Sequence, residues 1–155
     1  MKNELLQKNF AACLKQAKHL EVSLRRIKAI SPFDSVKLQN LSEDEVMVID
    51  AFIMQFGKLQ DMLGSKIFKT LVDLSMEKTG TMIDTLNTMD KLCILDDVDS
   101  WREIRVARNS VIHDYDLEEQ ETAQRLNNII NFVPNLFVIL ERAKSYVKEK
   151  FDIEV

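Results

Sequence analysis

Apolar side chains recur at steps of three and four residues along almost the whole chain, and this period restricts the possible folds more than any other feature. Three long stripes follow it, at residues 6–27, 46–74 and 126–151. Such a spacing places apolar side chains on one face of an α-helix, whereas no segment alternates with the period of two that a strand requires. The chain also holds only three glycines and two prolines in 155 residues. We therefore predict an all-α, antiparallel bundle of four to five helices.

Local signals predict where these helices begin and end. "SPFD" at 31–34 should stop the first helix, because proline keeps the preceding residue out of the helical region, and a loop should follow to about Leu41. Ser42 with Glu45, and Ser100 with Glu103, have the spacing of capping boxes, and each pair predicts a helix start. "KTG" at 78–80 separates the second stripe from a shorter helix with Met82, Leu86, Met89 and Cys93 turned inward.

Two interior glycines and one interior proline predict further details of the packing. Gly57 and Gly64 lie seven residues apart in the second stripe and therefore share one side of a helix. We expect another helix to approach closely there, in preference to a ligand contact. Pro134 lies within the last stripe and should kink that helix.

Composition and charge restrict the class of protein. A content of 46% hydrophobic and 30% charged residues excludes disorder, and the length fits a single domain over 1–155. Cys13 and Cys93 form no disulfide or metal-ligand pattern, so both are expected to be reduced core residues. With no signal sequence and no membrane span in view, a cytoplasmic protein is expected. The net charge of −4 means that any nucleic-acid site must be locally basic.

The segment "WREIRVARNSVIHDY" at 101–115 contains the side chains best suited to catalysis or ligand binding. At about 100° per residue, one arc of the helix is apolar except for a single arginine, Arg108. A permanently charged guanidinium in that position is costly unless an anion or a polar network meets it. The apolar arc consists of Trp101, Ile104, Val111 and Ile112, and a second, polar stripe consists of Arg102, Arg105, Asn109 and His113.

This arrangement suits phosphoryl chemistry on RNA without a metal. The imidazole of His113 can move protons between the ribose 2′-hydroxyl and the leaving oxygen, and the guanidinium of Arg108 can hold the phosphate. Asn109 can orient the ring or the phosphate, while Arg102 and Arg105 are expected to bind RNA. Because Arg108 and His113 point about 140° apart on an ideal helix, a two-fold dimer that pairs the helix ends would bring the groups together.

"RNSVIH" at 108–113 resembles the R-x4-6-H signature of the HEPN superfamily, and "RNSVIHDY" resembles the longer R-x4-H-x-Y form of HepT-like toxins. The surrounding "DDVDSWREIRVARNSVIHDYD" and the earlier "VIDAFIMQFGKLQDMLGSKIFKTL" are similar to the corresponding helices of that group. The resemblance covers about residues 43–150.

The resemblance implies a HEPN-type bundle that acts as a homodimeric, metal-independent endoribonuclease, with no cofactor. It implies catalytic roles for Arg108, Asn109 and His113 from each subunit, at the dimer interface. The toxins of this group pair with a minimal nucleotidyltransferase (MNT) antitoxin. In that pairing, Tyr115 would be the acceptor for AMP groups (AMPylation), which would repel RNA from a phosphate-binding cleft.

Structural alternatives remain open for each of these residues. Arg108 could be an ion-pair partner of Asp99, Glu103 or Asp114, while His113 could interact with the helix dipole and Tyr115 could pack with its hydroxyl in water. The main competing function is a non-catalytic HEPN module that binds substrate or docks to a nucleotidyltransferase. A helical scaffold without any site would require Arg108 to be fully salt-bridged inside the fold.

Overall fold

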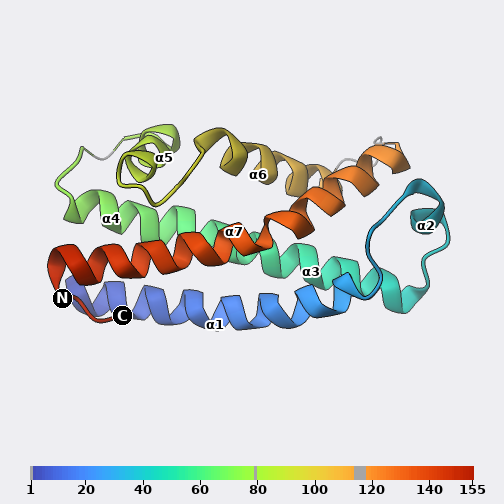
Figure 1. The fold of residues 1–155 in the computed structure, drawn as a ribbon, viewed down its shortest axis with the longest axis horizontal. Helices are drawn as coiled ribbons and strands as arrows, with labels where there is room; N and C mark the ends of the chain where they lie inside the picture. Colours follow the sequence, from blue (N-terminus) through green and yellow to red (C-terminus); the bar gives the residue numbers. More distant parts are fainter. Residues whose placement is uncertain (1, 79, 114–117) are drawn as a thin grey trace.

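The chain is all-α, as predicted, in a computed structural model that describes residues 2–78, 80–113 and 118–155, with the backbone alone described at 2, 112 and 113. Figure 1 shows the helices in order along the chain. They are α1 (Lys2–Lys28), α2 (Ser35–Gln39), α3 (Glu43–Met62), the π-helical segment η1 (Leu63–Phe68), α4 (Lys69–Leu74), α5 (Met82–Lys91), α6 (Val98–His113) and α7 (Glu119–Phe151).

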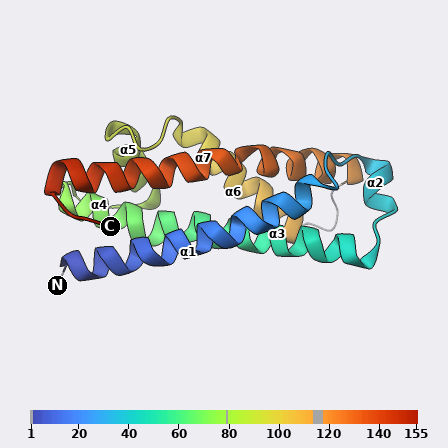
Figure 2. The same ribbon diagram turned by 60° about the horizontal axis from the view of Figure 1, so that its bottom comes forward.

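Three long rods form the body of the molecule: α1, the continuous run from α3 through η1 to α4, and α7 (Figures 1 and 2). α1 runs antiparallel to α3 along their length, and α7 runs antiparallel to α1. α6 packs across α3 and antiparallel to α7. The two ends of the chain lie at the same end of the bundle, where the Gln7 side-chain amide donates to the carbonyl oxygen of Glu154 at 3.0 Å.

The predicted apolar stripes supply the core. Buried side chains from α1, α3, η1, α4, α5, α6 and α7 form one cluster. Within it, the ring of Phe56 lies 6.1 Å from that of Phe52, and it lies 6.5 Å from that of the partly buried Phe132 in α7. α7 continues through Pro134, and Figure 1 shows the helix changing direction between its orange and red halves. This change of direction agrees with the predicted kink.

Two capping boxes open helices, but only one of them is at a predicted position. Ser42 and Glu45 cap α3 reciprocally, as expected, and the N–H and hydroxyl of Ser42 lower the pKa of the Glu45 carboxyl. The predicted box of Ser100 and Glu103 is wrong, because α6 already begins at Val98. The carboxylate of Asp97 accepts from the Asp99 N–H at 3.0 Å and from the Ser100 hydroxyl at 2.7 Å. An earlier acid therefore caps this helix and places Ser100 inside its first turn.

A second capping box, formed by Thr81 and Asp84, opens α5 and was not predicted. The segment expected to be a loop up to Leu41 also contains the short helix α2. There the Asp34 carboxylate accepts from the Lys37 N–H at 2.7 Å, as an N-cap residue does.

The two cysteines lie in different environments. Cys13 is buried, as expected, and burial raises the pKa of its thiol to about 11. Cys93 is exposed, so its assignment to the core is wrong. Because α5 ends at Lys91, its helical register does not reach Cys93, whose backbone turns into the left-handed region with φ of 63°. Ile94 and Leu95 take the buried positions instead.

Candidate functional site at the contact of α6 with α3

Trp101 anchors the N-terminal half of α6 against α3 and η1. Its side chain is buried, as predicted, with its ring centroid 5.0 Å from that of Phe68. A Cβ added at Gly64 would lie 3.8 Å from the Trp101 ring, an ordinary contact distance. The buried amide of Gln60 also donates to the carbonyl oxygen of Trp101 at 3.2 Å. These contacts fix the position and rotation of α6, and with them the direction in which Arg108 points.

Arg108 lies two turns further along α6 and points back onto α3. The predicted position in the apolar arc is confirmed, since only 8% of the side chain is exposed. Its Nη2 donates to Oδ1 of Asp61 at 2.6 Å, and its Nη1 lies over Gly57, where an added Cβ would be only 2.3 Å away. Another helix was predicted to approach closely at both interior glycines. At Gly57 the close contact is made by a side chain of α6, the Arg108 guanidinium, whereas at Gly64 the contact with Trp101 is an ordinary one. We call Arg108, Asp61 and Gly57 the Arg108 site.

The guanidinium in this site is only partly satisfied. Nε of Arg108 is buried without a hydrogen-bond partner among the described residues, and Oε1 of Gln60 is in the same state. A buried donor without an acceptor costs about 1–3 kcal/mol, and more when the group is charged. Unsatisfied buried groups are rare in native proteins, and strain, a catalytic role or a bound water or ion accounts for them. The Arg108 site thus has donor capacity beyond its one carboxylate.

The partner of Arg108 differs from those considered from the sequence. The ion pair is made with Asp61 of α3, and neither Asp99 nor Glu103 provides it; Asp114 lies outside the described residues. Asp61 follows Gly57 by four residues, so the two share one face of α3. The spacing of Gly57 and Asp61 is the one sequence signal for the ion pair of Asp61 with Arg108. It can be recognised only when the position of α6 on α3 is known.

The predicted polar stripe of α6 faces solvent where the structure describes it. Arg102, Arg105 and Asn109 are exposed, and within the described part of the chain neither arginine makes an ion pair. The side chain of His113 and the whole of Tyr115 lie outside the described residues. The structure therefore brings Arg108 into contact with Asp61. Asn109 is the next residue of α6, and its side chain faces solvent.

An open hollow of about 440 Å³ lies between the polar stripe and α7. Arg102 lines it from α6, and Arg125 lines it from α7, with Val106 and Ala107 between them. Two acids, Asp99 and Glu103, are also part of its lining. Sequence reasoning missed Arg125, because only the antiparallel packing of α6 on α7 brings that residue beside the stripe.

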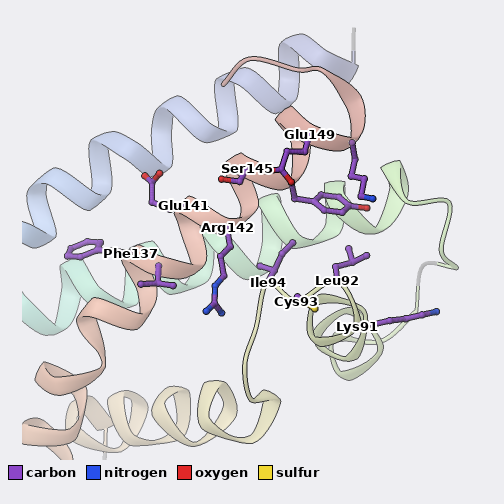
Figure 3. A pocket seen from close by; sticks show the side chains of 12 residues that line it. Lys91, Leu92, Cys93, Ile94, Phe137, Glu141, Arg142, Ser145 and Glu149 are labelled. Carbon is purple, nitrogen blue, oxygen red and sulfur yellow. The ribbon is translucent and has the colours of Figure 1, made fainter.

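A second groove, of about 720 Å³, lies between the connection from α5 to α6 and the C-terminal half of α7. Figure 3 shows Arg142 extending from α7 toward that connection, where its Nη1 donates to the Asp96 carboxylate at 2.7 Å. Cys93 and Tyr146 also line the groove, and partial burial raises the pKa of Tyr146. Arg102, Arg105, Arg108 and Asn109, whose side chains the structure describes, are not part of its lining.

In the described part of the chain, no three His, Cys, Asp or Glu side chains lie close enough together to hold a metal ion. No described helix is long and apolar enough to cross a membrane. Comparison of the chain with protein-family models, curated proteins and solved structures finds no match.

Proposed function

We propose that this chain is a metal-independent endoribonuclease of the HEPN type, the toxin of a toxin–antitoxin pair whose antitoxin is a minimal nucleotidyltransferase. The observation that carries the proposal is the Arg108 site: an arginine buried against α3 already binds an oxyanion, the Asp61 carboxylate, at 2.6 Å. Carboxylate and phosphate oxygens present the same kind of acceptor to a guanidinium. The exposed Arg102, Arg105 and Asn109 on the same helix support it, because they offer charge and an amide to an RNA strand.

The proposed reaction is transfer of the scissile phosphate to the neighbouring ribose. The imidazole of His113 removes the proton from the 2′-hydroxyl, whose oxygen attacks phosphorus. The bond from phosphorus to the 5′-oxygen breaks, which leaves a 2′,3′-cyclic phosphate on one product and a 5′-hydroxyl on the other. A protonated imidazole supplies the proton for the departing oxygen. Arg108 stabilises the charge that develops on the phosphoryl oxygens, and Asn109 orients the phosphate.

A homodimer is part of this proposal. His113 follows Arg108 by five positions in α6, which corresponds to about 140° of rotation and about 7.5 Å of rise. One chain therefore cannot easily direct both groups at one phosphate. Two copies related by a two-fold axis, with their α6 ends paired, would offer two arginines and two imidazoles to one cleft, one imidazole as base and the other as acid.

Regulation by the antitoxin is the second part of the proposal. Tyr115 would accept AMP groups, which would place phosphate charge and an adenine beside the cleft and so block RNA. We also propose that the protein acts in the cytoplasm, where its RNA substrates lie. Co-expression with a minimal nucleotidyltransferase antitoxin should increase the intact mass in AMP units, and Tyr115→Phe should remove that increase.

Two observations favour a second candidate, a non-catalytic HEPN module that docks to the nucleotidyltransferase. Arg108 is little exposed and is already paired, and the chain carries a net charge of −4, which does not attract RNA. This candidate predicts a complex with the nucleotidyltransferase but no RNA cleavage.

Cleavage of an end-labelled RNA by the purified protein in EDTA tests the choice between the two. Arg108→Ala and His113→Ala should each abolish the activity, while His19→Ala, which changes an exposed histidine on α1, should not. Equal cleavage by wild type and His113→Ala would refute the proposed chemistry.

A further inference from the structure

Among the described residues, the Arg108 guanidinium has one hydrogen-bond acceptor, and that acceptor is the acidic side chain of Asp61. Of its three nitrogens, Nη2 donates to Asp61, Nη1 is held over Gly57, and Nε is buried without a partner. Asp61 therefore already accepts from one of the two terminal nitrogens through which a guanidinium binds an oxyanion.

The two partners of this ion pair differ strongly in exposure. The side chain of Arg108 is 8% exposed, whereas that of Asp61 is 52% exposed. The carboxylate thus lies on the solvent side of the pair and the guanidinium lies beneath it. An anion that approaches from solvent meets the negative charge of Asp61 before it can reach Arg108.

The hydrogen bond between Arg108 and Asp61 is short and joins two charged groups. The separation of 2.6 Å between Nη2 and Oδ1 is that of a charge-assisted hydrogen bond. Gly57 leaves room for the guanidinium, since any larger residue would place an atom 2.3 Å from Nη1. α3 thus supplies both the space for the arginine and an oxyanion in front of it.

We infer that Asp61 occupies the position of a substrate phosphate in the free protein, so that an RNA phosphodiester must displace its carboxylate to bind Arg108. This inference rests on the proposed function. It makes Asp61 a residue that sets the affinity of the site for RNA. It also explains why the arginine can stay buried in the absence of RNA, since the carboxylate neutralises it until the phosphate arrives.

Replacing Asp61 by asparagine separates the charge of this residue from its shape. The asparagine oxygen can still accept from Nη2, so the contact between α3 and α6 keeps an acceptor, but the negative charge is lost. Removing a unit charge about 5 Å from a bound phosphate, at an effective dielectric between those of water and the protein surface, should raise the affinity for RNA roughly tenfold.

Asp50→Asn is the matched control for this substitution. Asp50 is an exposed acid of the same helix, eleven residues before Asp61, and therefore faces the same way about 16 Å away along α3. Arg108 forms its ion pair with Asp61 and not with Asp50. Both substitutions change the net charge equally, so only an effect specific to the Arg108 site will distinguish them.

Binding of a fluorescent single-stranded RNA with 2′-O-methyl riboses, which cannot be cleaved by attack of the 2′-oxygen, gives the readout by anisotropy at fixed ionic strength. We expect Asp61→Asn to bind about tenfold more tightly than wild type, Asp50→Asn to bind within about twofold of wild type, and the gain to disappear in Asp61→Asn combined with Arg108→Ala. Thermal midpoints of all variants show that each is folded.

Three results would overturn the inference: equal or weaker binding by Asp61→Asn, an equal gain in Asp50→Asn, or a gain that survives removal of Arg108. Binding too weak to detect in every variant would overturn it as well, because an uncovered arginine should capture phosphate. The proposed ribonuclease fails separately. If wild type cleaves RNA but Asp61→Asn does not bind RNA more tightly, only the proposed role of Asp61 is refuted. If Asp61→Asn binds more tightly but no variant cleaves ordinary RNA, the ribonuclease is refuted and Arg108 remains a phosphate-binding site.

Discussion

Replacing Gly57 by alanine tests whether this glycine exists to make room for Arg108. The added Cβ would lie 2.3 Å from Nη1 and 3.4 Å from Cζ of the guanidinium. Ordinary contact distances are about 3.5–4.0 Å, so Nη1 must move by about 1 Å or more. Because the guanidinium is a rigid plane, Nη2 moves with it, and the 2.6 Å bond to Asp61 cannot persist unchanged.

The expected cost follows from two opposing terms. Loss of a hydrogen bond between charged groups costs about 1.5–3 kcal/mol, while alanine favours the helix over glycine by about 1 kcal/mol. Gly57→Ala should therefore lower the free energy of unfolding by about 0.5–2 kcal/mol. In an Arg108→Ala background, the same change should instead raise it by up to about 1 kcal/mol, which gives a coupling of about 1.5–3 kcal/mol.

Urea unfolding followed by circular dichroism measures all four proteins of this cycle. Gly64→Ala is a control on the same rod, because its Cβ would meet Trp101 at 3.8 Å and should be neutral or slightly stabilising. If Gly57→Ala were stabilising in both backgrounds, Arg108 would not depend on Gly57 for its position, and the reasoning about the Arg108 site would be refuted.

Other regions of the molecule give further expectations. Trp101→Ala should destabilise the fold by about 3–5 kcal/mol in urea unfolding, because it empties the contact of α6 with Phe68, and a loss below about 1 kcal/mol would contradict that anchoring role. The pKa values of Glu45 and Asp84 lie below their ordinary values of 4.5 and 3.8, mainly because the N–H groups of Ser42 and Thr81 donate to them. The stabilisation from these caps is therefore present above about pH 4.5 and lost as the pH falls further, and a midpoint of thermal unfolding that stays constant between pH 5 and pH 3 would contradict it. A thiol reagent such as DTNB should modify Cys93 rapidly and Cys13 only on unfolding, since Cys13 is buried and its pKa is raised to about 11; fast reaction of two thiols in the native protein would be inconsistent with the fold.

Helical periodicity was sufficient to predict the fold class and most of the core. Helical stripes need no knowledge of tertiary contacts, and each of the three predicted stripes supplies buried residues, such as Phe10, Phe56 and Val133. The ends of helices were less certain, because several acids and hydroxyls compete to cap the same turn. Asp97 caps α6 in place of Ser100 for this reason. Cys93 is exposed because α5 ends at Lys91, two residues before it.

Some features of the candidate site could also be predicted from local sequence, and others depend on tertiary packing. The burial of Arg108 and the exposure of Asn109 follow from the rotation of one helix, and both could be predicted. The ion pair with Asp61 joins residues 47 positions apart, so it depends on how α6 crosses α3 and could not be read from a local pattern. Arg125 became a neighbour of the polar stripe through the packing of α7 in the same way.

The central claim is that the chain cleaves RNA by attack of the 2′-hydroxyl, with Arg108 on the phosphate. Identification of the product ends tests it most directly, with RNA digested in EDTA by protein whose intact mass shows no AMP adduct. Mass spectrometry should find 2′,3′-cyclic phosphate and 5′-hydroxyl ends with wild type and no product with Arg108→Ala. Products that carry 5′-phosphates, or the same cyclic-phosphate products at an equal rate from Arg108→Ala, would contradict the account.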